Sequence, residues 1–295
     1  MQTNIKHVTV VGAGVLGAQI AYQCAFAGFD VVSYDVNEEA LQAAKNRFAK
    51  LDDIYSNNLN VADSTITATN DRLVQSCQLE QSVANADLII ECVPENLQLK
   101  QSVWADIGHY TKDNCLFTTN TSTLLPSKFS ASSGDESRFL ALHFANDIWR
   151  MRIVEVMGTA KTNPEAVNII FEFAKAMQMS PVIIKKEQPG YIMNSLLVPF
   201  LHAACGLYAK EVADPADVDK VWKLATGSPK GPFEIMDLIG LRTLYAVTSA
   251  RAEQTGDPVT KKFVAMLKNN FLAQGKTGRE SGSGFYDYDE KGNLL

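Results

Sequence analysis

The 295-residue sequence predicts an α/β protein: a doubly wound parallel-sheet domain over residues 1–187, followed by an all-α domain over residues 188–295. Two observations predict this fold class. Up to Lys186, short apolar runs alternate with helical periods, which is typical of a parallel sheet covered by helices. From residue 190 to residue 272 only long helical periods recur, and the turn-forming Gln188-Pro189-Gly190 marks the change.

The opening stretch has the pattern of a Rossmann-like dinucleotide-binding unit. The apolar run Val8–Val11 leads into a G-x-G-x-x-G motif, a helical segment that ends at Gly28, and a second apolar run that ends at Asp35. A core strand and helix with incidental glycines would not explain these offsets. We therefore expect the cofactor to contact the motif, at Gly12, Gly14, Val15, Leu16 and Gly17.

Each feature of that pattern has a physical reason. Gly12 permits the tight turn after the strand, Gly14 lets backbone approach a pyrophosphate, and Gly17 lets the helix pack closely on the strand. The helix N-terminus attracts phosphates. Asp35 is placed to accept hydrogen bonds from ribose hydroxyls and would repel a 2′-phosphate, so the sequence predicts NAD rather than NADP.

The remaining elements follow from periodicity and turn residues. After the fingerprint we expect a polar insert over residues 56–63 and an irregular or partly helical segment over 71–84. Strands are expected over residues 65–69, 86–93, 115–119, 139–144, 153–156 and 181–185. Helices are expected over residues 38–55, 97–110, 164–177, 191–210, 215–225, 232–252 and 258–274.

Composition excludes several classes of function. A net charge of −6 argues against nucleic-acid binding, and no apolar run is long enough to span a bilayer. The five cysteines form no C-x-x-C pair and are interpreted as free thiols in a reducing compartment, so we expect a cytosolic protein. No H-x-x-x-H or C-x-x-C pattern predicts a metal site, and no P-loop motif is present.

A nicotinamide enzyme that oxidises an alcohol needs a base, and histidine suits this role near neutral pH. Of four histidines, His7 precedes the first strand, His109 lies near the end of a surface helix and His202 lies within a helix of the second domain. Only His143 lies at the carboxyl end of a predicted strand, where ligands of such sheets bind. His143 is therefore the candidate base.

Glu155 is the candidate partner of that histidine. It interrupts an apolar strand, and glutamate is rarely buried unless it is paired. If the strands over 139–144 and 153–157 are neighbours, Glu155 lies beside His143 and can orient the imidazole. The alternative is a residue of an edge strand that faces solvent.

Further polar residues follow buried strands. Ser122 and Asn120 can bond a substrate oxygen or the nicotinamide carboxamide, but from this segment alone an Asx or ST turn is the preferred interpretation. Glu95 and Asn96 can approach the nicotinamide ribose. Asn194 lies on an apolar helix, where a lone amide needs a partner.

This constellation resembles the L-3-hydroxyacyl-CoA dehydrogenases over nearly the whole chain. The segments that carry the resemblance, in order, are VVGAGVLGAQIA, ECVPENLQLKQSVW, TTNTSTL, FLALHFANDIWRMRIVEVM, PGYIMNSLLVPFL, GPFEIMDLIGL and SGSGFYDYD. The resemblance implies NAD-linked interconversion of a 3-hydroxyacyl-CoA and its 3-oxo form, in a homodimer built mainly through the helical domain.

The resemblance also implies roles for individual residues. His143 would be the catalytic base and Glu155 its partner. Ser122 and Asn194 would contact the reacting oxygen or thioester carbonyl, and Asn146 would help to hold the substrate. The residues implied at the nicotinamide end of the cofactor are Glu95, Lys100 and Asn120.

Two departures keep other functions open. The family commonly has Asn-Pro where this chain has Asn146-Asp147, and it places serine and lysine against CoA where residues 51–58 here are acidic to neutral. Relatives that act on free 3-hydroxy acids, of the sugar-acid or carnitine type, are the main alternative. A 3-hydroxyisobutyrate dehydrogenase type expects lysine where Asn194 stands. A non-enzymatic NADH-binding protein, like a lens crystallin related to the family, is the third.

Overall fold

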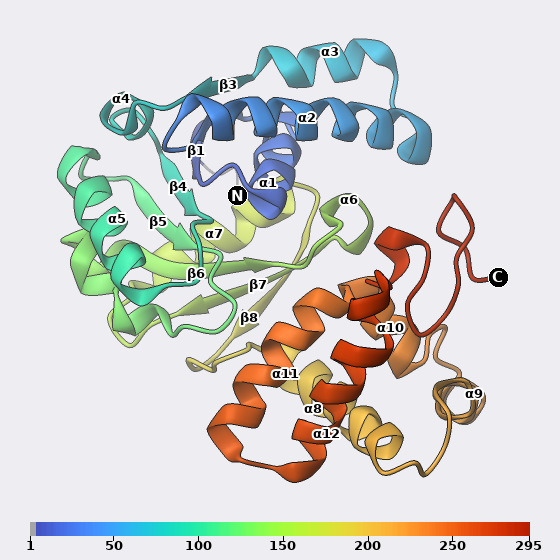
Figure 1. Ribbon diagram of the computed structural model, residues 1–295. Coiled ribbons are helices and arrows are strands. Elements are labelled where there is room, and N and C mark those ends of the chain that lie inside the picture. The colour runs from blue at the N-terminus through green and yellow to red at the C-terminus, as the bar shows by residue number, and fades with distance from the viewer. Residues whose placement is uncertain (1–3) are drawn as a thin grey trace. The chain divides into compact units, whose positions relative to one another are not determined.

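The computed structural model describes residues 4–295, which form two compact units that divide between Ile192 and Met193. We call them the sheet unit and the helical unit, and each is described by itself. The division lies five residues after the predicted boundary of 187/188. The predicted fold class is confirmed, since a mixed, mostly parallel sheet with helices precedes an all-α unit (Figure 1).

The described part of the sheet unit contains one sheet in the order β3-β2-β1-β4-β5-β6-β7-β8. All neighbours are parallel except β6 and β7, which are antiparallel. The strand order reverses between β1 and β4, and ligands of such sheets bind beyond the carboxyl ends at this point. The strands are β1 His7–Val11, β2 Asp30–Tyr34, β3 Leu73–Ser76, β4 Leu88–Glu91, β5 Leu116–Thr119, β6 Phe139–Phe144, β7 Ile153–Gly158 and β8 Ser180–Ile184.

Helices cover both faces of this sheet (Figure 1). Buried apolar side chains of α1, α2 and α7 form one core cluster with alternate strand residues, and α5 packs into a second cluster through Trp104 and Ile107. The sheet-unit helices are α1 Val15–Phe26, α2 Glu38–Leu59, α3 Asp63–Asp71, α4 Leu79–Val83, α5 Leu97–Tyr110, α6 Ile148–Met151 and α7 Pro164–Ala176, with 3-10 turns at Pro126–Lys128, Ser130–Ser133 and Glu136–Arg138.

The helical unit packs around its own apolar core, in which Phe233, Met236 and Phe263 are fully buried. No strand was expected in this unit, and its described residues contain only isolated bridges near the C-terminus. Its helices are α8 Met193–Ala209, α9 Pro215–Thr226, α10 Pro232–Ile239, α11 Leu241–Thr255 and α12 Pro258–Asn270, with 3-10 turns at Leu272–Gln274 and Arg279–Ser281.

The predicted strand over residues 65–69 is wrong, because this segment lies within helix α3. The alternation of threonines suggested a strand, but their hydroxyls bond back to the helix backbone. Thr67 Oγ1 donates to the Asp63 carbonyl at 3.0 Å, and Thr69 Oγ1 donates to the Thr65 carbonyl at 2.8 Å. These bonds satisfy the hydroxyl groups within the helix, so the threonines are compatible with helical backbone here.

Three further boundaries differ from the prediction. The polar insert over 56–63 is mostly the end of α2, which continues to Leu59 and stops at Asn60 in the left-handed conformation. The segment over 71–84 contains strand β3 and helix α4. The helix predicted over 232–252 is broken at Gly240, where φ is 92°. A backbone angle of this sign favours glycine and ends a helix.

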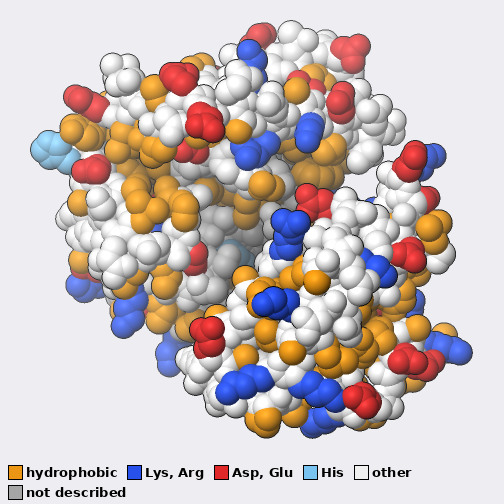
Figure 2. Space-filling view, in the orientation of Figure 1, with side chains coloured by type: hydrophobic (Ala, Val, Ile, Leu, Met, Phe, Trp, Pro, Cys, Tyr) orange, Lys and Arg blue, Asp and Glu red, His pale blue; other side chains and the backbone are white. Residues whose placement is uncertain are grey.

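No helix among residues 4–295 is long and apolar enough to cross a membrane. The face shown in Figure 2 carries lysine and arginine interspersed with aspartate and glutamate in each unit. All five cysteines are free.

Candidate active site

The glycine loop between β1 and α1 has the geometry that the motif predicts. Gly12 has φ of 102°, and a side chain there would collide with the Cys92 carbonyl. A side chain at Gly17 would collide with the Gly12 carbonyl, which explains the close packing of helix on loop. Around Gly14 the space is open, so backbone is left accessible at the start of α1.

This loop fits a dinucleotide. Helix α1 begins at Val15 with no side-chain cap and no acidic residue in its first turn, so its N–H groups and positive dipole end remain available to a pyrophosphate. The Asp35 carboxylate accepts from Ala13 N and Val36 N, each at 2.8 Å. A carboxylate has about four acceptor positions, so capacity remains for ribose hydroxyls. Leu16 lies in the first turn of α1.

His143 and Glu155 meet on neighbouring strands, as the sequence predicted. They are opposite each other in the antiparallel pairing of β6 and β7. His143 Nδ1 lies 2.9 Å from Glu155 Oε2, and both side chains are almost fully buried. The solvent-exposed alternative for Glu155 is therefore wrong.

The remaining contacts fix this pair in one orientation. Glu155 Oε1 accepts from Ile192 N at 2.8 Å. The ring of Tyr191 stacks on the His143 ring, with centroids 4.3 Å apart and planes 12° from parallel. Sequence reasoning missed Tyr191, because only the turn at Gly190 brings this ring back over the histidine. The imidazole thus has its plane and one nitrogen held, while Nε2 faces away from the carboxylate.

Ser122 completes this group. Its Oγ lies 3.2 Å from His143 Nε2, and it is half-buried. The Ser122 hydroxyl faces the imidazole rather than forming an ST turn, and the Ser122 backbone N–H donates to Glu95 Oε1 at 3.1 Å. A substrate hydroxyl that reached this point would therefore find a hydroxyl and an imidazole nitrogen together.

Glu95 anchors the turn that carries Ser122. Besides Ser122 N, its Oε1 accepts from Thr121 Oγ1, from Thr123 N and Oγ1, and from Leu124 N, at 2.6 to 3.2 Å. Burial alone would raise the pKa of Glu95, but the bonds from Thr121 and Thr123 and the charge of Lys100 outweigh it and lower this pKa. The carboxylate is thus held in its charged form.

Lys100 lies beneath the surface, and its predicted role beside the cofactor stays a prediction. Its side chain is 1% exposed, and its ammonium group bonds Glu91 Oε1 at 2.6 Å. Asn120, at the end of β5, accepts from Phe144 N at 2.9 Å and ties the ends of β5 and β6 together. Glu91, the fully buried last residue of β4, was missed because it reads as one polar residue in an apolar strand.

Two further residues were predicted to contact the substrate. Asn146 is exposed in the loop between β6 and α6, where Asp147 and Arg152 adopt left-handed conformations at either end of α6. Asn194 lies at the start of α8 in the helical unit. The substrate roles of both residues stay predictions.

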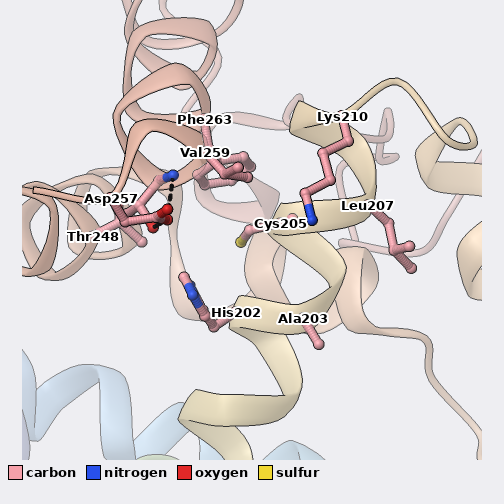
Figure 3. Close-up of a pocket in the computed structure, with 11 residues that line it drawn as sticks. His202, Ala203, Cys205, Leu207, Lys210, Thr248, Asp257, Val259 and Phe263 are labelled. Carbon is pink, nitrogen blue, oxygen red and sulfur yellow. Dashed lines mark hydrogen bonds between the residues drawn. The ribbon is translucent and has the colours of Figure 1, made fainter. Parts of the chain in front are cut away.

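The other histidines lack the arrangement around His143. His202 lines a pocket of about 270 Å³ within the helical unit, together with Cys205, Lys210 and Phe263 (Figure 3). The acid of that pocket, Asp257, caps α12 by accepting from Thr260 N and Oγ1. Burial, with Arg251 nearby, lowers the pKa of His202. Residues 4–295 contain no cluster of three or more side chains suited to hold a metal ion.

Comparison with known proteins identifies related chains. The model for the NAD-binding domain of 3-hydroxyacyl-CoA dehydrogenase matches residues 7–188, and the model for its C-terminal domain matches residues 190–288. The mitochondrial hydroxyacyl-coenzyme A dehydrogenase of Rattus norvegicus is 35% identical over 292 residues, covering 96% of this chain and 91% of the relative. A probable 3-hydroxybutyryl-CoA dehydrogenase of Bacillus subtilis is 31% identical, covering 98% and 99%.

Solved structures also match this chain over nearly its whole length. A diketoreductase described for dual catalysis of dicarbonyl compounds has a TM-score of 0.92 and 46% identity, covering 97% of this chain and all of that chain. FadB2 of M. tuberculosis has a TM-score of 0.86 and 29% identity, covering 97% and 99%. These matches span both units, so neither unit is an addition to a shorter relative.

Proposed function

The chain belongs to the 3-hydroxyacyl-CoA dehydrogenase family and is an NAD-dependent oxidoreductase, and from this premise we propose that it interconverts a (S)-3-hydroxyacyl-CoA and the 3-oxoacyl-CoA. The observation that carries the proposal is the ordered line of Ser122, His143 and Glu155, which presents a basic nitrogen beside a hydroxyl. This is the arrangement that removes a proton from an alcohol.

Three side chains of the protein take part in the proton transfer. His143 Nε2 accepts the proton of the substrate 3-hydroxyl in the oxidative direction and returns it in the reductive one. Glu155 accepts from Nδ1–H, which keeps the lone pair on Nε2 and stabilises the imidazolium once it forms. Ser122 Oγ positions the same substrate oxygen. When bound, NAD supplies the acceptor for the hydride from C3.

Tyr191 and Ile192 support this chemistry without touching the reacting atoms. The stacked Tyr191 ring prevents rotation of the imidazole, and Ile192 N holds the second carboxylate oxygen. A base so fixed loses no orientational freedom when substrate binds, which is a large source of catalytic advantage. Asn194 and Asn146 are proposed to bond the thioester end of the substrate.

The test uses purified protein with NADH and acetoacetyl-CoA, followed at the NADH absorbance. We expect NADH to be oxidised in proportion to enzyme. The proposal fails if no CoA ester is reduced while NADH reduces a free 3-oxo compound, or NAD oxidises a free 3-hydroxy compound, at the same enzyme concentration.

A second candidate is a dehydrogenase of substrates that lack CoA. The end of α2 carries acids where a CoA-binding relative is expected to carry positive charge. Asp52 accepts from Tyr22 OH at 2.6 Å and from Asn70 at 3.1 Å, and Asp53 beside it is exposed. Two carboxylates repel the phosphates of CoA. The 46% identical diketoreductase is described as acting on dicarbonyl compounds, which supports a comparison of CoA esters with free dicarbonyls in one assay.

We also propose that the chain forms a homodimer. Helical-unit residues that are large, apolar and exposed include Leu196, Val221, Leu224 and Val247, which supports a homodimer through this unit. The expected cytosolic location stays a prediction.

A further inference from the structure

We propose that Arg47 is a cofactor-binding residue, whose guanidinium group holds the pyrophosphate of the dinucleotide against the glycine loop. No motif of the sequence indicates this role, because the dinucleotide fingerprint ends at Asp35. The inference goes beyond the proposed function, since it concerns NAD binding, which is the same whichever hydroxy compound is oxidised. A negative result for one therefore leaves the other intact.

Arg47 reaches the glycine loop from helix α2. This helix begins at Glu38, shortly after Asp35, and a long helical side chain points back toward the start of its helix. The Arg47 side chain accordingly returns to the loop between β1 and α1, where Nη1 donates to the Ala13 carbonyl at 3.3 Å. Ala13 lies between the first two glycines of the motif and is buried. The contact places a guanidinium group beside the backbone that a pyrophosphate approaches.

Most of the hydrogen-bonding capacity of Arg47 remains open. A guanidinium group carries five N–H donors and no acceptor. Among residues 4–295, the Ala13 carbonyl is its one hydrogen-bond acceptor, and no carboxylate forms an ion pair with it. The side chain is nevertheless half-buried, and a cation withdrawn from water needs a counter-charge. A phosphate group supplies one and accepts two parallel bonds from the same guanidinium group.

The charges around the glycine loop also favour a cation at this place. The motif itself, residues 12–17, contains no charged side chain. The N-terminus of α1 contributes a positive end equivalent to about half a charge. A dinucleotide brings one negative charge on each phosphate, and the Asp35 carboxylate, which accepts from Ala13 N at 2.8 Å, adds another at the same loop. Arg47 offsets an excess of negative charge that the helix dipole alone cannot balance.

Arg47→Met tests this role directly. Methionine keeps much of the apolar stem but removes the charge and the donors. Hydrogen bonds to charged groups strengthen binding by about 10-fold or more, so we expect the Kd of NADH, from fluorescence titration, to rise about 10-fold. Because ions screen an attraction between charges, this loss should shrink between about 0.01 M and about 1 M NaCl, where the Debye length falls from roughly 30 Å to about 3 Å.

Arg72 provides a matched control in the same unit. It is also half-buried, and its Nη1 likewise donates to one backbone carbonyl, that of Ala68, at 2.8 Å. Arg72 directly precedes β3, at the amino edge of the parallel strands, whereas the glycine loop follows β1 at their carboxyl edge. Arg72→Met therefore removes the same charge from the protein but not from the cofactor site. We expect it to leave the Kd of NADH unchanged.

The alternative is that Arg47 only supports the loop, through its bond to the Ala13 carbonyl. That role predicts that R47M lowers the free energy of unfolding of the cofactor-free protein, and that its loss of NADH affinity does not respond to salt. Phosphate binding predicts an unfolding free energy equal to or above that of the wild type, because R47M removes a half-buried cation that forms no ion pair within residues 4–295. Urea unfolding without cofactor measures this difference.

The titrations with NADH and NADPH give the deciding outcomes. An unchanged NADH affinity in R47M overturns the proposal, and so does an equal loss in R72M. A loss confined to NADPH also overturns it, because Arg47 would then bind a 2′-phosphate rather than the pyrophosphate. If R47M cannot be purified, Arg47→Gln repeats the test, since it removes the charge and keeps an amide donor. Wild-type NADH affinity in R47Q at low salt would contradict the proposal.

Discussion

Both units bury acidic side chains, and the most deeply buried ones have different kinds of partner in the two units. In the sheet unit, Glu91 and Glu155 pair with Lys100 and His143, which are themselves titratable. In the helical unit, Asp219 and Asp237 are equally buried, but the groups that donate to them are backbone N–H groups and tyrosine hydroxyls.

The helical-unit acids hold the chain together. Asp219, on α9, accepts from Phe233 N and Glu234 N at the start of α10 and from Tyr286 OH, each at 2.9 Å. Asp237, on α10, accepts from the backbone of residues 285 and 286 and from Tyr288 OH. Both attach the C-terminal segment to the helices.

Burial alone therefore does not distinguish a carboxylate that takes part in proton transfer from one that only stabilises the fold. A carboxylate surrounded by backbone donors is satisfied in one charge state only, whereas one beside an imidazole can stabilise a proton that arrives during reaction. The nature of the partner is the useful criterion, and substitutions in each unit can test it.

The largest expected effect is that of His143→Gln. Glutamine keeps a polar side chain near Glu155 but cannot act as the base, so we expect kcat to fall by at least ~10²-fold. NADH binding, measured by fluorescence, should be retained.

The matched control makes the same change in the helical unit. His202→Gln, in the pocket of Figure 3, should leave kcat unchanged, because the carboxylate in that pocket, Asp257, accepts from Thr260 and is not hydrogen-bonded to the imidazole. Near-normal turnover of H143Q would remove the sheet-unit pair from the mechanism.

Asp219→Asn should act on stability. The amide NH₂ would face one of the N–H or O–H donors that now point at the carboxylate, and such a buried mismatch costs about 1–3 kcal/mol. Urea unfolding followed through Trp222, the tryptophan of α9, measures it. Asp217→Asn, two residues away and exposed, is the control. Equal stability of both variants would mean that the buried acid is dispensable.

The sequence predicted the sheet-unit site better than the helical unit's network. His143 and Glu155 could be paired because adjacent strands have a fixed register, and the glycine motif has fixed offsets. Tyr191 stacking and the Glu91–Lys100 pair depend on how loops and α5 return to the sheet, which periodicity does not encode.

The errors have a related origin. The threonine alternation over 65–69 carries strand propensity, but the hydroxyls found helical backbone acceptors instead. Asp219 and Asp237 look like ordinary helix-surface acids in the sequence, and only the C-terminal segment folding over them makes them buried. Long-range packing, rather than local pattern, decides both cases.

Asp35 offers an intermediate case, a half-buried acid with spare acceptor capacity. It accepts from Ala13 N, while Arg47 donates to the Ala13 carbonyl at 3.3 Å. Asp35→Ser removes the charge that repels a 2′-phosphate and leaves Arg47 beside it. We expect about 10-fold tighter NADPH binding, by fluorescence titration, since two like charges about 4 Å apart repel by about 1 kcal/mol when water screens them fully, which is close to the ~1.4 kcal/mol of a tenfold change. The gain should be smaller in D35S/R47A, because only the relief of repulsion remains there; an equal gain in both variants would exclude a role for Arg47.

The smallest expected effect is the dependence of stability on pH, which compares a buried acid of each unit directly. The pKa of Glu95 is lowered in the folded protein, so its stabilisation is present above the unfolded value of about 4.3 and is lost as pH falls through the folded pKa. The stability gap between the wild type and Glu95→Gln should therefore shrink as pH falls below that value.

Asp219 should show the opposite sign. Burial raises its pKa despite the bonds from Phe233 and Glu234, so its contribution is complete below about 3.9 and declines as pH rises through the folded pKa. Urea titrations of E95Q and D219N across pH 3.5 to 7.5 compare the two units directly, with the range chosen at roughly these pKa values. If both stability differences change in the same direction with pH, the type of partner does not set the preferred charge state of a buried carboxylate. A carboxylate beside a lysine and one buried among neutral donors would then respond alike.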